Sequence, residues 1–152
     1  MLEHVDRFIQ KIALVLLLAV LLGIPAAAWS YEKNQVKKYP PNAKVFNITG
    51  VARLGMWTEA RVNGLNYWRD DLPRLNKIQV KKGDLVVLRL KSSDLVHGFT
   101  IPELEIDAGQ VKAGKINTVQ FVADKAGSFT FRCSQFCNAA HPAMFGVLEV
   151  AE

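Results

Sequence analysis

An uncharged stretch of twenty residues, Ile12 to Tyr31, limits what this chain can fold into more than any other feature. Lys11 and Glu32 bound it. At a rise of about 1.5 Å per residue, a helix of this length spans roughly 30 Å, which is the thickness of a bilayer's hydrocarbon core. The sequence therefore predicts a transmembrane helix over 12–31 that follows an N-terminal tail over 1–11, with the lipid bilayer as a partner.

A cleaved signal peptide is the alternative to a retained helix. The run from Ile12 to Ile24 has the length of an apolar signal core, and the alanines at 26–28 resemble a cleavage site. However, Glu3 and Asp6 make the N-terminal segment acidic as well as basic, and the apolar run is long for a signal. We therefore favour a retained anchor.

The charge balance says little about partners and leaves the orientation of the helix open. Lys and Arg outnumber Asp and Glu by 19 to 14, but the two kinds are interleaved, so we do not expect nucleic-acid binding. Four lysines follow the helix, and two basic residues precede it, which taken alone favours a cytoplasmic C-terminal domain. Folded domains translocate largely regardless of this rule, so the chemistry of the domain must decide. These basic residues are Lys33, Lys37, Lys38 and Lys44 after the helix, and Arg7 and Lys11 before it.

The remainder reads as a linker over 32–44 and a folded domain over 45–152. Pro40 and Pro41 predict an extended, stiff connector. The domain consists of short stretches that often alternate apolar and polar residues and are separated by turn formers, which predicts an antiparallel β-sandwich or barrel of about seven strands. The aromatic and charged stretch 55–76 fits neither period and is interpreted as a long loop or a short irregular helix. The strands are expected at 45–54, 77–84, 85–91, 98–102, 117–123, 128–133 and 146–150.

Potential metal ligands gather between the last two predicted strands, in the segment CSQFCNAAHPAMFG. Two cysteines in an exported domain are commonly a disulfide. Here His141 and Met144 follow Cys133 and Cys137 closely, so one tight loop could turn thiolate, imidazole and thioether toward one point. This soft ligand set suits copper better than zinc or magnesium. His97, at a strand junction, is the fifth candidate.

Two segments, DLVHGFTIP and CSQFCNAAHPAMFGVLEV, resemble the ligand segments of cytochrome c oxidase subunit II, which carries the binuclear copper centre CuA. The likeness covers about Lys77 to Val150 and includes a C-x3-C-x3-H-x2-M string and a D-x2-H some forty residues upstream. A subunit II with a single membrane helix is more like that of the B-type heme-copper oxidases. The resemblance implies a mainly β, cupredoxin-like Greek-key fold with one N-terminal transmembrane helix.

The resemblance also implies a role for each residue of the motif. Cys133 and Cys137 would bridge two copper ions. His97 and Met144 would complete one copper, and His141 with the backbone carbonyl of Gln135 would complete the other. Asp94, three residues before His97, would orient the ligand loop, although a plain turn residue is an equal alternative.

Other implied features depart from the family or leave alternatives open. Gln135 replaces a glutamate that reaches magnesium in the mitochondrial type, so magnesium is doubtful. Trp57, Tyr67 and Trp68 are candidates for the point where electrons enter, and each is also a plausible packing aromatic. Acidic residues that would attract a basic cytochrome c are sparse, so the donor could dock by an apolar patch or carry acidic charge itself.

The expected function is that of subunit II of a heme-copper oxygen reductase. It would accept electrons from a c-type cytochrome and pass them to the hemes of subunit I, where O2 is reduced to water. The chain would then be an oxidoreductase subunit that transfers electrons only, anchored once in the inner membrane with its copper domain on the periplasmic side.

Three other functions compete with this one. A membrane-anchored mononuclear blue-copper protein would use His97, Cys137, His141 and Met144 and leave Cys133 idle. In a thiol-disulfide protein or copper chaperone, the C-x3-C pair would begin a helix, whereas here it follows strands. Nitrous oxide reductases also carry CuA, but we expect no room here for their large catalytic domain.

Overall fold

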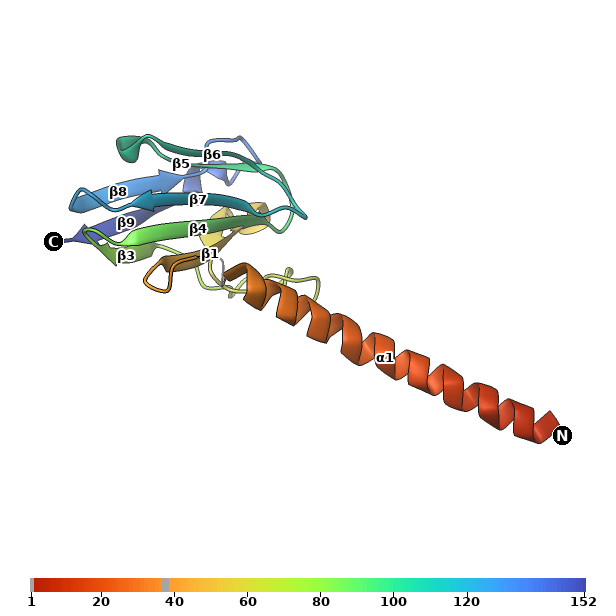
Figure 1. Cartoon of the computed structure of the whole chain (residues 1–152). Coiled ribbons are helices and arrows are strands. Elements are labelled where there is room, and N and C mark those ends of the chain that lie inside the picture. Colours follow the sequence, from red (N-terminus) through yellow and green to blue (C-terminus); the bar gives the residue numbers. More distant parts are fainter. Residues whose placement is uncertain (1, 37–38) are drawn as a thin grey trace. The chain divides into compact units, whose positions relative to one another are not determined.

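The computed structural model describes residues 2–36 and 39–152, which divide into an N-terminal unit and a β-domain (Figure 1). The first compact unit ends at Pro41, and the second covers Asn42–Glu152. Lys37 and Lys38, in the middle of the predicted linker, lie outside the described residues, as does Met1 of the predicted tail.

Helix α1 covers Leu2–Val36 and is longer than the predicted span of 12–31. Within it, Arg7–Tyr31 has a mean hydropathy of 2.6 and is long and apolar enough to cross a membrane. The prediction of an extended connector is wrong for residues 32–36, which continue the helix. Pro40 disfavours helical backbone at the residue before it, so the helix cannot extend that far.

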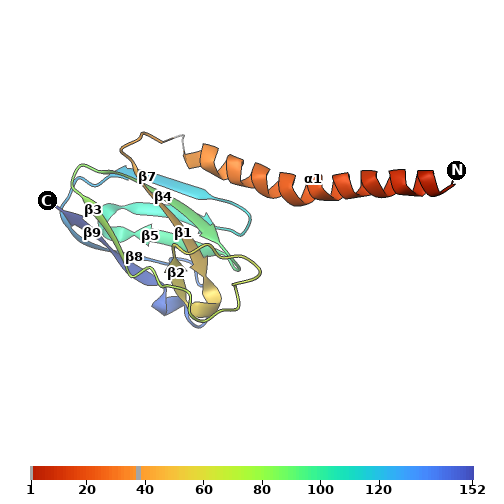
Figure 2. The same ribbon diagram turned by 90° about the horizontal axis from the view of Figure 1, so that it is seen from below.

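The β-domain contains nine strands in two sheets, against about seven predicted. The first sheet has the order β2-β1-β4-β7, and the second has the order β3-β9-β8-β5-β6. Figures 1 and 2 show the two sheets as the layers of a sandwich. The strands are β1 (Lys44–Val51), β2 (Met56–Thr58), β3 (Lys77–Lys81), β4 (Leu85–Ser92), β5 (His97–Ile101), β6 (Ile106–Val111), β7 (Asn117–Val122), β8 (Gly127–Arg132) and β9 (Phe145–Ala151).

The mainly β sandwich is confirmed, but the expectation of a purely antiparallel one is wrong. β1 pairs with β4 in parallel, and β3 pairs with β9 in parallel, while the other pairs are antiparallel. Parallel neighbours require a crossover rather than a hairpin, and alternation within a strand carries no information on the direction of its partner. The predicted irregular stretch 55–76 is a loop, except that it begins with the short strand β2.

The core lies between the two sheets and extends to the end of the domain where β5 begins. Strand β4 is buried from Val86 to Leu90 because it is an inner strand. Strand β3 shows the half-buried alternation expected from its sequence. Trp57, Phe99 and Phe131 are the largest fully buried side chains. Phe99 contacts both other rings, with centroids 5.3 Å and 5.5 Å away, so the aromatic core is continuous up to the ligand residues.

Candidate metal centre

The loop between β8 and β9 is closed by its own backbone. The Cys133 amide donates to the Met144 carbonyl at 2.9 Å, which joins the two ends of the loop. Inside it, the Asn138 side chain accepts the Ala140 amide at 2.9 Å, an Asx turn that reverses the chain. A short 3-10 helix, η3 (His141–Ala143), follows, with Pro142 in its first turn. The sequence of the loop thus folds both ends of the ligand segment back to one place.

The predicted ligand atoms face one another. The Cys137 sulfur lies 3.4 Å from the Met144 sulfur and 3.9 Å from His141 Nδ1. The Cys133 sulfur lies 3.9 Å from His97 Nδ1 and 3.2 Å from the Gln135 carbonyl oxygen. The structure therefore brings together all five predicted side chains and the predicted carbonyl.

Both cysteines belong to the described part of the chain, and both are free thiols. Ligand atoms of His97, Cys133 and Cys137 all lie within 4.8 Å of one another, a separation that a metal ion could bridge. Two thiols, two imidazole nitrogens, a thioether and a carbonyl form a soft donor set with a weak sulfur ligand, which fits copper. The Gln135 side chain is exposed, so only its carbonyl belongs to the cluster.

The cluster is buried on one side and accessible on the other. His97 is fully buried, and Met144 is 1% exposed, whereas Cys137 and His141 are half-buried. A cavity of about 400 Å³ opens beside Cys133, His141 and Met144 and gives a metal a route to the sulfurs.

Packing and one carboxylate fix the orientation of the His97 ring. Its Nε2 lies 3.0 Å from Asp94 Oδ1, which leaves Nδ1 toward the sulfurs. Trp57 packs on the other side, with ring centroids 5.6 Å apart. A Cβ at Gly50 would come within 2.8 Å of the His97 ring, so only glycine leaves room for it there. Asp94 thus contacts the ring of a predicted ligand, a contact that a plain turn residue would not require.

Hydrogen bonding between His97 and Cys133 shifts the pKa of the imidazole upward and the pKa of the thiol downward. Burial lowers the pKa of His97, but its hydrogen bonds to Asp94 and Cys133 outweigh burial and raise that pKa to about 9. Burial raises the pKa of Cys133, but the hydrogen bond to His97 and two backbone amides outweigh it and lower that pKa below its usual range. Burial and the charge of Cys133 raise the pKa of Cys137. Metal binding at neutral pH must therefore displace protons from this site.

The three aromatic candidates occupy different positions. Trp57 is fully buried in the core, and its Nε1 has no hydrogen-bond partner among the described residues. The Tyr67 hydroxyl donates to Asp94 Oδ2 at 3.2 Å. Trp68 is 73% exposed and packs edge-on against Tyr67, with centroids 5.0 Å apart. Of the three, Trp68 alone presents a large surface to a partner.

A turn that sequence reasoning missed supports the ligand loop. This turn after β1 is the 3-10 helix η1 (Ala52–Leu54) with Gly55, drawn in yellow beside the blue ligand loop in Figure 2. The Ala52 carbonyl accepts the Asn138 side chain at 2.6 Å. Arg74 donates to the carbonyls of Gly55 at 3.1 Å and Ala143 at 2.8 Å. Gly55 has a φ of 56°, a conformation that favours glycine. The glycine itself was therefore the one local sign of this turn in the sequence.

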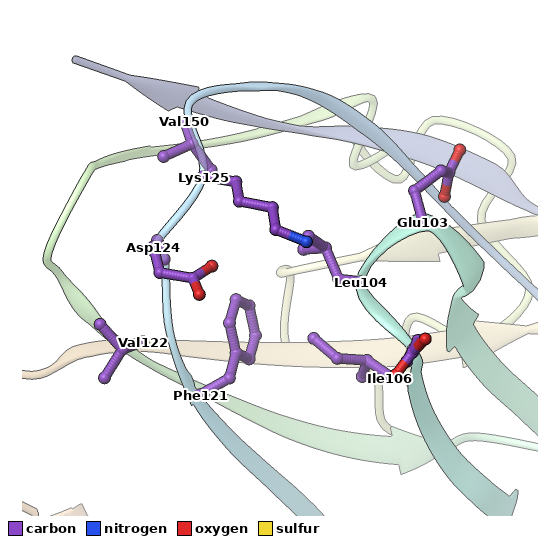
Figure 3. A pocket seen from close by; sticks show the side chains of 10 residues that line it. Glu103, Leu104, Ile106, Phe121, Val122, Asp124, Lys125 and Val150 are labelled. Carbon is purple, nitrogen blue, oxygen red and sulfur yellow. The ribbon is translucent and has the colours of Figure 1, made fainter.

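A second cavity lies at the opposite end of β5 and offers different chemistry (Figure 3). Its volume is about 300 Å³, and it is lined by apolar side chains such as Phe121 and by Glu103, Asp124 and Lys125. It contains no cysteine or histidine, so the soft ligands of the domain are concentrated at the His97 end.

Comparison with known proteins places this arrangement in a family. Residues 28–151 match the family model of the cytochrome c oxidase subunit II periplasmic domain. Cytochrome c oxidase subunit 2 of Thermus thermophilus is 32% identical over 77 residues, which are 51% of this chain and 56% of that protein. Nitrous-oxide reductase of Ralstonia nicotianae is 42% identical over 71 residues, which are 44% of this chain and 11% of that enzyme. The chain thus matches about half the length of the Thermus relative and a small part of the reductase.

Solved structures share the fold. The periplasmic domain of cytochrome oxidase subunit II from Bradyrhizobium japonicum has a TM-score of 0.57 at 21% identity, with 74% of this chain and 87% of that chain covered. A chain from a heme-copper terminal oxidase dimer has a TM-score of 0.53 at 19% identity, with 93% and 98% covered. Auracyanin A, a blue copper protein of Chloroflexus aurantiacus, has a TM-score of 0.50 at 14% identity, with 71% and 98% covered. The cupredoxin-like fold predicted from sequence is confirmed.

The long apolar helix and the periplasmic domain fit a membrane-anchored subunit, and the cysteine and histidine cluster fits copper. The match extends over most of the β-domain and includes both ligand segments. This chain belongs to the cytochrome c oxidase subunit II family.

Proposed function

We propose that this chain is the subunit of a heme-copper oxygen reductase that receives electrons at a binuclear copper centre. A c-type cytochrome would supply the electrons, and the hemes of subunit I would take them for the reduction of O2 to water. The observation that carries the proposal is the pairing of each free thiol with its own imidazole, Cys133 with His97 and Cys137 with His141.

The residues of this site would hold two copper ions, and these would share one electron between them. Cys133 and Cys137 would contribute both thiolates, His97 and His141 would each contribute Nδ1, and Met144 and the Gln135 carbonyl would complete the set. A second thiolate distinguishes this set of ligands from that of a site with one cysteine. Gln135 does not supply the carboxylate that magnesium prefers, so we propose no magnesium site.

The scaffold keeps these ligands in place between redox states. His97 begins β5, Cys133 follows β8, and Met144 precedes β9, so three strands of one sheet hold the ligand positions. Asp94 orients the His97 ring and holds a proton at Nε2, which leaves Nδ1 free for the metal. Little rearrangement is then needed when an electron arrives or leaves.

We infer that electrons enter at Trp68. It is the exposed member of a chain of contacts that continues through Tyr67 and Asp94 to the ligand His97. Trp57 packs directly on His97 but is fully buried, so a docked partner could not touch it. The domain would face the periplasm, because the family model that it matches is that of a periplasmic domain.

The blue-copper alternative is retained because auracyanin A shares the fold. Metal stoichiometry and the EPR spectrum of the copper-loaded full chain in detergent separate the two functions. Two coppers per chain, with hyperfine splitting from two equivalent nuclei, support the proposal. One copper with splitting from a single nucleus would refute it in favour of blue copper.

The Cys133→Ser variant sharpens this experiment. If Cys133 bridges two metals, the variant loses the two-nucleus spectrum and binds at most one copper. An unchanged spectrum would show that Cys133 is not a ligand. Ser134→Ala is the matched control, because Ser134 is adjacent in the same loop, is exposed and is not one of the predicted ligands.

A further inference from the structure

Arg53 holds the backbone on both sides of Trp68. Its Nη2 donates to the Tyr67 carbonyl at 2.8 Å and to the Arg69 carbonyl at 2.6 Å. Its Nη1 forms an ion pair with Asp70 at 2.5 Å. These three acceptors belong to residues 67, 69 and 70, so the guanidinium brackets the exposed tryptophan between them.

The same residue is tied to the ligand side of the site. Arg53 lies in η1, and its backbone amide lies 3.4 Å from Asp94 Oδ2, while the amide of Ala52 donates to that oxygen at 2.8 Å. Asp94 in turn contacts His97 at 3.0 Å. One residue therefore connects residues 63–71, called the Trp68 loop below, to the carboxylate that orients a predicted copper ligand.

Without this bracket the Trp68 loop has few long-range attachments among the described residues. Its own hydrogen bonds are local, such as the Tyr67 amide to the Asn63 carbonyl at 2.9 Å and the Arg69 amide to Asn66 at 3.1 Å. The Tyr67 hydroxyl bond to Asp94 is the other connection to the site. A mostly exposed loop with local bonds is the kind of segment that opens readily.

We propose that Arg53 is a positioning residue that fixes Trp68 relative to His97 for electron uptake. This inference rests on the proposed function of Trp68. The guanidinium divides these contacts between two nitrogens, with Nη1 on the carboxylate and Nη2 on the two carbonyls. The single, compact ammonium of lysine does not reproduce this planar fork. The half-buried Arg53 side chain holds the Trp68 loop in the arrangement that a docking donor meets. The loop therefore does not have to become ordered when the donor docks.

The first measurement is hydrogen exchange of residues 63–71 in the full chain in detergent. In Arg53→Gln and Arg53→Lys we expect exchange of this segment to become about tenfold faster or more. Arg69→Gln is the matched control, since it removes one positive charge from the loop itself and breaks only the exposed pair with Asp71. Unchanged exchange in Arg53→Gln, or equally fast exchange in Arg69→Gln, would overturn the inference.

The second measurement compares two reductants of the copper-loaded chain by stopped-flow. A soluble c-type cytochrome must use the docking surface, whereas hexaammineruthenium(II) is small and can approach the site from other directions. In Arg53→Gln and Arg53→Lys we expect about tenfold slower reduction by the cytochrome, because orientation is lost. Reduction by the ruthenium complex and the EPR spectrum should keep their wild-type values.

Trp68→Phe separates the inference from the proposal beneath it. If this variant reacts with the cytochrome at the wild-type rate, electrons do not enter at Trp68, and the proposed uptake site fails. If Trp68→Phe is slow but both Arg53 variants react at the wild-type rate, the positioning role of Arg53 alone is refuted. Loss of the copper spectrum in the Arg53 variants would also refute it, since Arg53 would then support the metal site itself.

Discussion

Replacing Asp94 by asparagine should destabilise the metal-free domain, because the carboxylate accepts hydrogen bonds on both oxygens. Oδ1 accepts the Leu95 amide at 2.7 Å, and Oδ2 accepts the Ala52 amide at 2.8 Å. An asparagine must turn its NH2 group toward one of these two N–H donors, whichever way the amide is flipped. Losing a hydrogen bond to a charged group and leaving its partner unpaired costs about 1.5–3 kcal/mol.

Urea unfolding of residues 42–152 measures this cost, since the described core lies within that unit. We expect Asp94→Asn to lower the free energy of unfolding by about 2–3 kcal/mol and, through the less constrained His97, to weaken copper binding by about 10–100-fold. Asp124→Asn, at an exposed position, should stay within about 0.5 kcal/mol of wild type. A loss below that limit for Asp94→Asn would show that the carboxylate is not a shared acceptor.

Three further outcomes test the surroundings of the site. Gly98→Ala places a Cβ within 2.2 Å of Ser134 Oγ and 3.0 Å of the Gln135 amide nitrogen. It should lower the free energy of unfolding in urea by about 1–3 kcal/mol and change the copper spectrum. Ser134→Ala should rescue it only in part, because the backbone clash remains. Arg74→Gln removes the donor to the Ala143 carbonyl next to the predicted ligand Met144, so copper should dissociate faster into a chelator. An unchanged dissociation rate would show that this hydrogen bond does not support the ligand loop. Copper uptake should release protons, and copper affinity should increase as pH rises toward about 9, because His97 must lose the proton that its raised pKa retains. Calorimetry in buffers of different ionisation enthalpy measures this proton release. An affinity that does not change with pH would contradict the prediction.

Much of the ligand set was predictable because it is local in the sequence. Cys133, Cys137, His141 and Met144 fall within one loop, and their spacing by itself indicates a shared site. His97 was different, since a strand pairing brings it to Cys133 across 36 residues. Its place at a strand junction made it a candidate beside the four ligands of the loop, and the resemblance to a family then supported it, although a histidine in a β-domain is usually a packing residue.

The parts that sequence reasoning missed depend on long-range contacts or on weak patterns. Strand β6 carries Asp107 and Gly109, which read as a turn, and it forms only as the edge of a sheet beside β5. β2 is three residues long, too short for a period to be visible. Arg53 and Arg74 act on carbonyls up to 69 residues away, and an arginine in a polar loop gives no sign of such a role.

The position of β9 governs when the metal site can form during biosynthesis. β9 lies inside its sheet, between β3 and β8, and the ligand loop is closed by the backbone bond between Cys133 and Met144, just before β9 begins. A ribosome or translocation pore that still holds residues 145–151 therefore leaves the loop without one of its two supporting strands. We therefore expect metal to bind after β9 has been released, when the folded sandwich presents an open cavity at the sulfurs.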